Sequence, residues 1–519
     1  MIHASVPGDF FESKHPDIQL LGTLNRPYDL AVASARTCYS SKGIIRPEQV
    51  SVDERARALR DRVAASTREA GHLTTRQHAH FVFALSHVSR QFLWSFLHSH
   101  PYYNSEQVSQ RYVKVKGNHF TIPKLGSSEK LLYEKILNLQ MGAYEKLIIL
   151  LMPAVTEEYF RIFKNRKRPD QRWQNVIQKK AFEVARYILP VATQAYLYHT
   201  VSALTLLRYH RVSQSADTPS EQRFIVNRMV EEVLKIDPDF EKEIDRKAIL
   251  ARPAEDQQSF SKTRSFIQSF DNQLFGKFSK LIDANQHAET TLADAVRLVL
   301  ARTDISDQQA IDIVLDPKHN RDLGDTFNVT TLSPLSRALF QIHFTFIKKI
   351  SHTADSQNQR HRMTPAARAS LERHYFGEPD VVYPKLFERV PQAKKLYEDV
   401  VHQTVLAVNT LLKKGVSFEK AQYLLPNGWA VRFEESGDLL NWHHKWKLRT
   451  CYNAQEEIFY ASVDELTQVS KQFPSIGKHI LAPCYLRQQA SMTPYCPEGD
   501  RYCGVPVWKK RIDQYDRLI

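Results

Sequence analysis

Apolar and polar positions alternate in two short stretches that lie far apart in the chain. The first is FVFAL, which begins at Phe81, and the second is FQIHFTF, which begins at Phe340. A period of two residues is typical of a half-buried strand. We therefore predict a strand in each stretch, with the aromatic side chains in a core rather than on a surface for stacking bases.

Helical periodicity surrounds both predicted strands. DLAVASARTCYS, which contains Arg36, and TLADAVRLVLA, which contains Arg297, place small and apolar residues at helical spacing ahead of them. After each strand a serine, Ser89 or Ser351, precedes a stretch that we predict to be helical. Serine favours this position because its hydroxyl accepts a hydrogen bond from the first helical turn.

These landmarks recur at constant distances. Arg36 and Arg297 are 261 residues apart, and so are Ser109 and Ser370. VARYILP and KAQYLLP end at residues 190 and 426, which are 236 apart. Such a repeat indicates two copies of one unit, and the first copy carries roughly 25 more residues between its serine and its proline.

The repeat predicts an α+β fold with two units, each a β-sheet with packed helices. We place the first unit at residues 1–250, a polar linker at 251–275 and the second unit at 276–473. A cysteine-bearing C-terminal extension occupies 474–519.

Composition narrows the functional classes. No stretch of about 18 apolar residues occurs, and the N-terminus lacks the apolar core of a secretion signal. Five cysteines at irregular spacing are typical of free thiols in a reducing cytoplasm. The net charge of +14 would attract phosphorylated small molecules or nucleic acids. Because the basic residues are interleaved with acids, we expect no nucleic-acid partner. The cysteines and the absence of a long apolar stretch favour a cytoplasmic protein without a membrane partner.

The second predicted strand is followed by an unusual cluster, Arg360-His361-Arg362, and seven residues later by Ser370. Adjacent cationic groups repel one another, and bound anions would relieve that repulsion. In a helix, Gln357, Arg360 and His361 would share one face. A solvated, non-functional face is the alternative interpretation of the cluster alone.

This pattern resembles the signature of the flavin-dependent thymidylate synthases. Gln357 matches the glutamine that precedes the family's RHR motif by three residues. Downstream, LRTCYNAQEEI resembles the family's LR…AQWEI segment and aligns Arg449 with the family arginine. Arg432 matches a further family arginine, and His444 occupies a flavin-contacting position whose residue type differs.

The first unit resembles the same family through other motifs. GHLTTRQHAHFVF is similar to the family's GHxSxxEHxxFxF, with His78 at the family histidine. VARYILP places Arg186 at an arginine that the family uses for the nucleotide phosphate. SEQVSQRYV is similar to SxxQxSxRY and supplies four further residues: Gln107, Ser109, Gln110 and Arg111.

The losses in the two units are complementary. The first unit reads Ser99-His100-Pro101 where RHR would stand, whereas the second has Gln422 in place of the phosphate arginine. Family enzymes are homotetramers whose sites combine residues from different subunits. The resemblance therefore implies one composite site built from both units, in a homodimer that mimics the tetramer.

The resemblance also implies the reaction and the residue roles. It implies methylation of dUMP to dTMP with FAD as cofactor and with NADPH and methylenetetrahydrofolate as co-substrates. The expected catalytic residues are Arg360 and Arg449; the expected substrate-binding residues are Gln357, Gln107, Ser109, Gln110, Arg111 and Arg186; the expected cofactor-binding residues are His78, His361, Arg362, Arg432 and His444.

Two other functions remain open at this point. Because several flavin positions differ, the chain is alternatively a non-catalytic nucleotide-binding paralogue of the family. A third hypothesis is a nucleic-acid-binding protein that uses the basic charge. Cys484, Cys496 and Cys503 lack the paired spacing of zinc sites, so we predict no metal.

Overall fold

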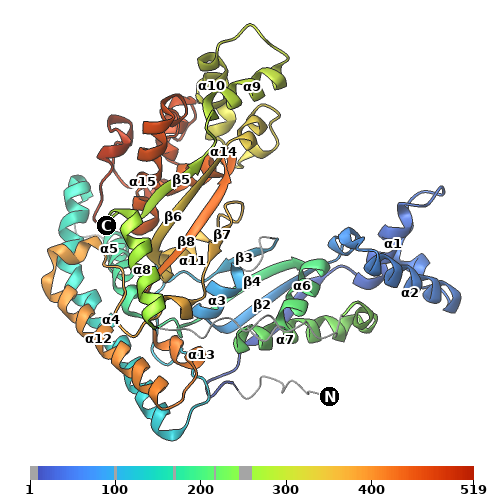
Figure 1. Cartoon of the computed structure of the whole chain (residues 1–519), viewed down its shortest axis with the longest axis horizontal. Coiled ribbons are helices and arrows are strands. Elements are labelled where there is room, and N and C mark those ends of the chain that lie inside the picture. Colours follow the sequence, from blue (N-terminus) through green and yellow to red (C-terminus); the bar gives the residue numbers. More distant parts are fainter. Residues whose placement is uncertain (1–9, 99–101, 167–170, 215–217, 245–259) are drawn as a thin grey trace.

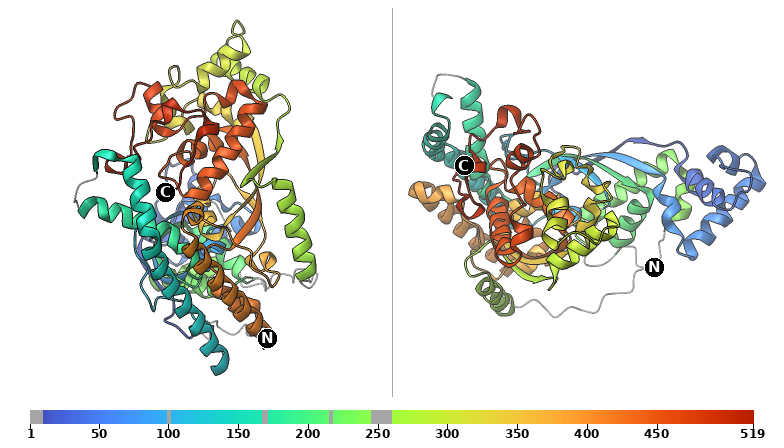
Figure 2. Two further views of the ribbon diagram at one scale, coloured as in Figure 1. Left: turned by 90° about the vertical axis from the view of Figure 1, so that its left-hand side faces the viewer. Right: turned by 90° about the horizontal axis from the view of Figure 1, so that it is seen from above.

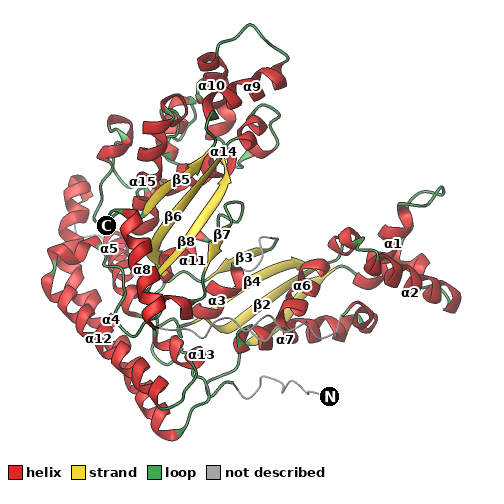
Figure 3. Ribbon diagram, in the orientation of Figure 1, coloured by secondary structure: helices red, strands yellow, loops and turns green. Residues whose placement is uncertain are grey.

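The computed structural model describes residues 10–98, 102–166, 171–214, 218–244 and 260–519. Two four-stranded antiparallel sheets form its framework, one in each half of the chain (Figure 1, Figure 3). The first has the order β1-β2-β4-β3 and the second the order β5-β6-β8-β7. The strands are β1 Asp17–Thr23, β2 His80–Ser89, β3 Asn104–Gln107, β4 Gln194–Ser202, β5 Ser279–Ala284, β6 His343–Ser351, β7 Ala366–Arg368 and β8 Ala430–Asp438.

The identical strand order shows that the chain has two repeated α+β units. The register shows the same correspondence, because Ser89 faces Gln194 and Ser351 faces Ala430. The pairing of β2 with β4 shifts between Leu85 and Val88, which makes Phe81 equivalent to Phe344. The prediction that the second strand begins at Phe340 is therefore wrong: residues Ser336–Gln341 form a 3-10 turn before β6.

Helices cover these sheets and extend from their outer ends (Figure 1). The first half contains α1 Pro27–Thr37, α2 Glu54–Glu69, α3 Arg90–Leu97, α4 Ser127–Ile162, α5 Gln171–Ala185, α6 Ala203–Ser213 and α7 Ser220–Ile236. The second half contains α8 Phe260–Leu274, α9 Ala288–Leu300, α10 Asp307–Leu315, α11 His352–Asn358, α12 Pro391–Lys413, α13 Phe418–Ala421, α14 Leu439–Arg449, α15 Glu456–Gln472, α16 Pro474–Gly477 and α17 Pro483–Gln489.

The range predicted as a linker, 251–275, contains helix α8. Its residue Asp271 accepts hydrogen bonds from Arg432 of β8 and from Lys349 of β6. These contacts attach α8 to the second sheet. The remainder of that range, and the boundary proposed at residue 250, lie outside the described residues.

Serine N-caps start the two helices that follow the central strands, as the sequence predicts. The Ser89 hydroxyl accepts a hydrogen bond from Phe92 N, and the Ser351 hydroxyl accepts one from Ala354 N. Helix α11 ends at Asn358, however, so Arg360 and His361 do not continue its face. The chain tightens into turns here because Arg360 N donates to Gln357 O and His361 N to Asn358 O, each three residues back.

The two units meet along their equivalent segments, near the centre of the molecule (Figure 1, Figure 2). Pro190 and Pro426 form an antiparallel bridge between the two LP segments. Trp94 of α3 donates its Nε1–H to Asp355 of α11 at 2.8 Å. Side chains from both halves share one buried apolar core around this contact.

Two buried glutamates link the halves symmetrically. Glu221 accepts hydrogen bonds from Ser89 of its own unit and from Tyr423 of the other. Glu457 accepts equivalent bonds from Ser351 and from Tyr187. Since each glutamate joins a helix N-cap to the opposite unit, the ends of α3 and α11 are held in a set orientation. Among the described residues, no helix is long and apolar enough to cross a membrane.

Candidate functional site

A cavity of about 310 Å³ lies where the two units meet. The loop after β3 and the first turn of α3 form one wall, and α11 with the turn after it forms another. Seven residues predicted from the sequence line it, five from the first unit and two from the second: Gln107, Ser109, Gln110, Arg111 and Arg186, with Gln357 and Arg360. The fold thus brings residues of both units together within one chain.

Buried hydrogen-bond donors without partners define this cavity. In Arg186, which is 6% exposed, neither Nε nor Nη2 has a partner. The Nε groups of Arg90 and Arg111 and the Nε2 of Gln110 also lack partners. Buried polar groups are normally paired, and an unpaired buried cation costs even more. A cluster of unpaired N–H groups therefore indicates a binding site for an anion.

Electrostatics support the same conclusion. Burial, together with the charge of neighbouring Arg186, lowers the pKa of Arg90 to about 9. Burial also lowers the pKa of Arg186. The pKa of Arg111 is raised instead, because Glu183 outweighs the effect of burial. An anion placed beside Arg90 and Arg186 would restore their preference for the charged state.

Glu183 and the backbone hold Arg111 in place. Its Nη2 donates to Glu183 at 3.0 Å and to the carbonyl oxygen of Asn453 at 2.7 Å. Arg90 likewise donates to Gln107 at 3.1 Å and to the carbonyl oxygen of Val108 at 2.7 Å. Both arginines are thereby fixed while their Nε groups stay unpaired, so the site is preorganised.

A second cavity, of about 370 Å³, adjoins the first and shares Glu106, Gln107 and Arg360 with it. Arg360 is 44% exposed and pairs with Glu106 at 2.8 Å. Arg362 lies over the ring of Tyr103, with 4.9 Å between its guanidinium carbon and the ring centre. This cavity therefore offers cationic and aromatic groups next to the anion site.

Arg449 and His361 are paired with each other rather than with the solvent. Arg449 donates its Nε–H to His361 Nε2 at 2.7 Å, so this ring nitrogen carries no proton. Burial and the charge of Arg449 hold the pKa of His361 well below its usual value. The ring of His444 lies 6.0 Å from that of His361. Burial and the positive charges of Arg111 and Arg360 together lower the pKa of Arg449 to about 9.

Four of the five predicted cofactor residues line neither cavity: His78, His361, Arg432 and His444. The predicted catalytic residue Arg449 also lines neither cavity. Arg432 is fully buried, and its guanidinium binds Asp271 and Asp380 at 2.6–2.7 Å. His78 is exposed and follows a 3-10 turn ahead of β2. The segment Ser99–Pro101, which replaces RHR in the first unit, lies outside the described residues.

Sequence reasoning missed Arg90 and Asn427. Arg90 directly follows the N-cap serine Ser89, is the first residue of α3 and lines the composite cavity. That position was a usable signal in the sequence. Asn427 donates to Gln110 and to the carbonyl oxygen of Arg186, a role that only the meeting of the two LP segments creates.

Four of the five cysteines gather near the C-terminal extension. Cys451, Cys484, Cys496 and Cys503 are free thiols, and burial raises the pKa of each. The thiols lie close enough to influence one another's titration. Within the described part of the chain, no group of three or more His, Cys, Asp or Glu residues is arranged to hold a metal ion.

Comparisons with known proteins agree with the geometry. The family model described as thymidylate synthase complementing protein matches residues 19–239 and again residues 280–475. A flavin-dependent thymidylate synthase of Clostridium tetani is 29% identical over 225 residues, 43% of this chain and 83% of that protein. One from Geobacter sulfurreducens is 30% identical over 173 residues, 33% of this chain and 71% of that protein.

Proposed function

The chain belongs to the flavin-dependent thymidylate synthase family, and from this premise we propose that it methylates dUMP to dTMP at the composite cavity between its two units. The observation that carries the proposal is Arg186, a buried arginine with two unpaired nitrogens in a cavity lined by both units. A phosphate matches such a donor because a guanidinium presents parallel N–H groups to its oxygens.

In this proposal the phosphate of dUMP binds to Arg186, Arg90 and Arg111. Ser109 lines the same wall and supplies a neutral hydroxyl. These groups come from the first unit. Arg90 lies in helix α3, Arg186 lies in a 3-10 turn, and Arg111 lies in a loop and is hydrogen-bonded to Glu183. Binding would place an anion among buried cations, which relieves their mutual repulsion.

The uracil then lies toward Gln357 and Arg360 of the second unit. The amide oxygen of Gln357 is buried without a hydrogen-bond partner, and it would accept the N–H of the base. Methylation requires carbon 5 of uracil to become electron-rich. Arg360 and Arg449 would stabilise the charge that develops on the uracil oxygens.

The second cavity fits a flavin's combination of anionic and aromatic groups. Besides Arg362 and Tyr103, it contains the hydroxyl of Ser105, a buried group without a partner. A flavin held there would supply hydride chemistry with NADPH as the donor, and methylenetetrahydrofolate would supply the carbon. In this chain Arg360 and Arg362 would orient the cofactor, with His361 and His444 beside them. We leave Arg432 and His78 out of this proposal, because Arg432 is paired with Asp271 and Asp380 and neither residue lines either cavity.

A non-catalytic nucleotide-binding paralogue is the second candidate. It is favoured by the paired state of Arg432, since that arginine is locked between two aspartates rather than presented to a cofactor. The two candidates differ in flavin binding. The active enzyme retains FAD, whereas the paralogue binds dUMP without it.

The visible absorption spectrum separates these candidates. We expect purified protein supplied with FAD to show a flavin spectrum that shifts on addition of dUMP, because the two cavities share Arg360. Turnover with NADPH and methylenetetrahydrofolate should follow. A protein that binds dUMP but takes up no FAD would support the paralogue and refute the enzyme.

Arg360→Ala tests the catalytic assignment. We expect kcat/KM to fall by about 10²-fold or more, the usual effect of removing one donor that stabilises developing charge. Stability should change little, since its ion pair with Glu106 is exposed. Arg302→Ala, at an arginine of similar exposure (47%), is the matched control. Wild-type turnover by Arg360→Ala would remove Arg360 from the mechanism.

We also propose a homodimer, in which two chains supply the four units of the family's tetramer. Light scattering should then give a mass twice the chain's 60.1 kDa. A mass of one chain together with full activity would show that the composite site needs no second copy.

A further inference from the structure

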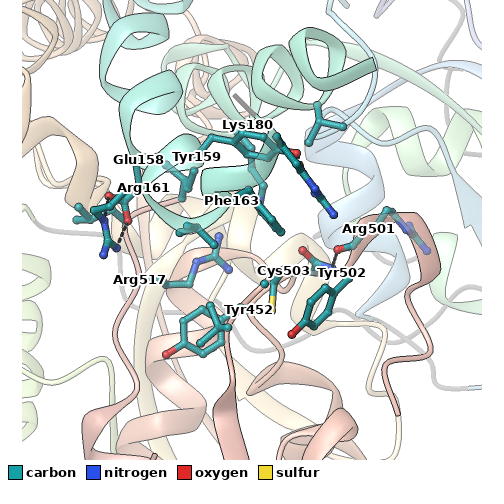
Figure 4. Close-up of a pocket in the computed structure, with 18 of the residues that line it drawn as sticks. Glu158, Tyr159, Arg161, Phe163, Lys180, Tyr452, Arg501, Tyr502, Cys503 and Arg517 are labelled. Atoms are coloured by element: carbon teal, nitrogen blue, oxygen red, sulfur yellow. Dashed lines mark hydrogen bonds and ion pairs between the residues drawn. The ribbon is translucent and has the colours of Figure 1, made fainter. Parts of the chain in front are cut away.

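A separate cavity of about 260 Å³ lies between helices α4 and α5 and the C-terminal extension (Figure 4). It shares no lining residue with the composite cavity. Residues 501–519 supply much of its wall, beyond the part of the chain that the family model matches. The family match therefore does not account for this part of the cavity wall.

Two cations face this cavity, and neither forms an ion pair with a residue that the structure describes. Lys180 comes from α5, and burial together with Arg517 lowers its pKa to about 8. Arg517 is 6% exposed, and its Nη1 donates to the carbonyl oxygen of Ala454 while its Nε has no partner. The nearby acids are already engaged, because Glu158 pairs with Arg161 and Asp516 pairs with Lys385.

Glu183 connects this cavity to the composite one. Burial raises its pKa, but Arg111, Lys180, Arg517 and Arg186 together lower it to about 2. Two further buried acids lie near these cations, Glu456 near Arg517 and Glu457 near Arg186, but burial raises the pKa of both. Arg186 faces the composite cavity, whereas Lys180 and Arg517 face the cavity beside the C-terminal extension. Four cations therefore stand against three buried carboxylates, and a bound anion would improve this balance.

Aromatic side chains also line this cavity. The ring of Phe163 projects between Lys180 and Arg517 in Figure 4. It also contacts Arg166, whose guanidinium carbon lies 3.8 Å from the ring centre, and Tyr159, whose ring centre lies 4.9 Å away. Tyr452 lies across the cavity (Figure 4). Since both rings line the cavity, a ligand with a flat apolar body would contact them as well as the cations.

We propose that this cavity is a second binding site, which takes a small ligand with an anionic group on an aromatic body. Lys180 and Arg517 bind the anionic group, and Phe163 and Tyr452 contact the body. The size of the cavity limits the ligand to about that of a mononucleotide or an aromatic carboxylate. The proposal concerns binding and does not depend on the reaction proposed above.

Calorimetric titration with phenyl phosphate tests the site. The Arg186→Met background is used throughout, so that the composite cavity does not contribute. We expect binding that weakens about tenfold or more in Lys180→Met, since a direct charge partner is lost. Lys179→Met, at the exposed neighbour on the same helix, should bind as the background does. Equal affinity in Lys180→Met and Lys179→Met would overturn the proposal.

Further probes define the ligand class. Benzoate that binds at the Lys180-dependent site would identify carboxylates as ligands, and binding of phenyl phosphate alone would identify phosphate monoesters. Phenol that binds as tightly as phenyl phosphate would overturn the anionic part, and inorganic phosphate that does so would overturn the aromatic part. If Lys180→Met does not fold, Arg517→Gln is titrated instead and is expected to weaken phenyl phosphate in the same way.

Discussion

Arg186→Met is expected to weaken dUMP binding by roughly 100-fold or more, about 3 kcal/mol, because it removes a buried cation that has two unpaired N–H groups in the composite cavity. Thermal stability should stay the same or rise. The unliganded protein bears the cost of keeping this charge buried, and the apolar methionine stem fills similar space without that cost. Titration calorimetry and a thermal melt measure the two effects.

This pairing of effects separates a ligand-binding role from a structural one. A structural arginine would lower the melting temperature when removed, whereas a binding arginine would not. Arg186→Lys keeps the charge but loses the planar fork, so an intermediate loss of affinity is expected. Arg228→Met, at an exposed arginine of α7, is the control. Unchanged dUMP affinity in Arg186→Met would place the phosphate elsewhere.

Glu435→Gln is expected to cost 3–5 kcal/mol of folding stability, to the order of magnitude known for broken buried ion pairs. Glu435 on β8 is 1% exposed and pairs with Lys348 and Lys445, both of which are also buried. Only Glu465 would remain to balance the two lysines. Urea denaturation followed by circular dichroism measures the loss.

The same carboxylate also shapes the turn that carries Arg360–Arg362. Glu435 accepts hydrogen bonds from Asn358, just before that turn, and from Thr364, just after it. We therefore expect Glu435→Gln to weaken FAD binding as well. Glu434→Gln, at the exposed neighbour on the same strand, should change neither property. Equal stability of the two variants would show that the buried network contributes little.

The pH dependence of Glu435 has a definite sign. Burial raises its pKa, but Lys348 and Lys445 lower it to about 2, below the ordinary 4.5. A carboxylate with a depressed pKa stabilises the fold above its ordinary pKa, and this contribution is lost as the pH falls from 4.5 toward 2. Glu435→Gln should therefore lack this part of the acid sensitivity.

The sequence by itself determined the two repeated units. Alternating apolar positions, serine N-caps and the recurring LP segments are local signals, since they depend on strand periodicity, first-turn hydrogen bonding and backbone geometry. The equal strand order of the two sheets agrees with them. The motifs also predicted which unit would supply each group of site residues, and the cavity between the units contains seven of them.

Only the tertiary structure decided which of those residues are free to bind. Arg432 is held by Asp271, which lies 161 positions earlier in a helix that the sequence suggested to be a linker. Arg186 keeps two nitrogens without a partner, and Asn427 of the other unit binds its carbonyl oxygen and not its side chain. The pairing of a buried charge depends on groups that are distant in sequence, and local patterns do not encode those distances.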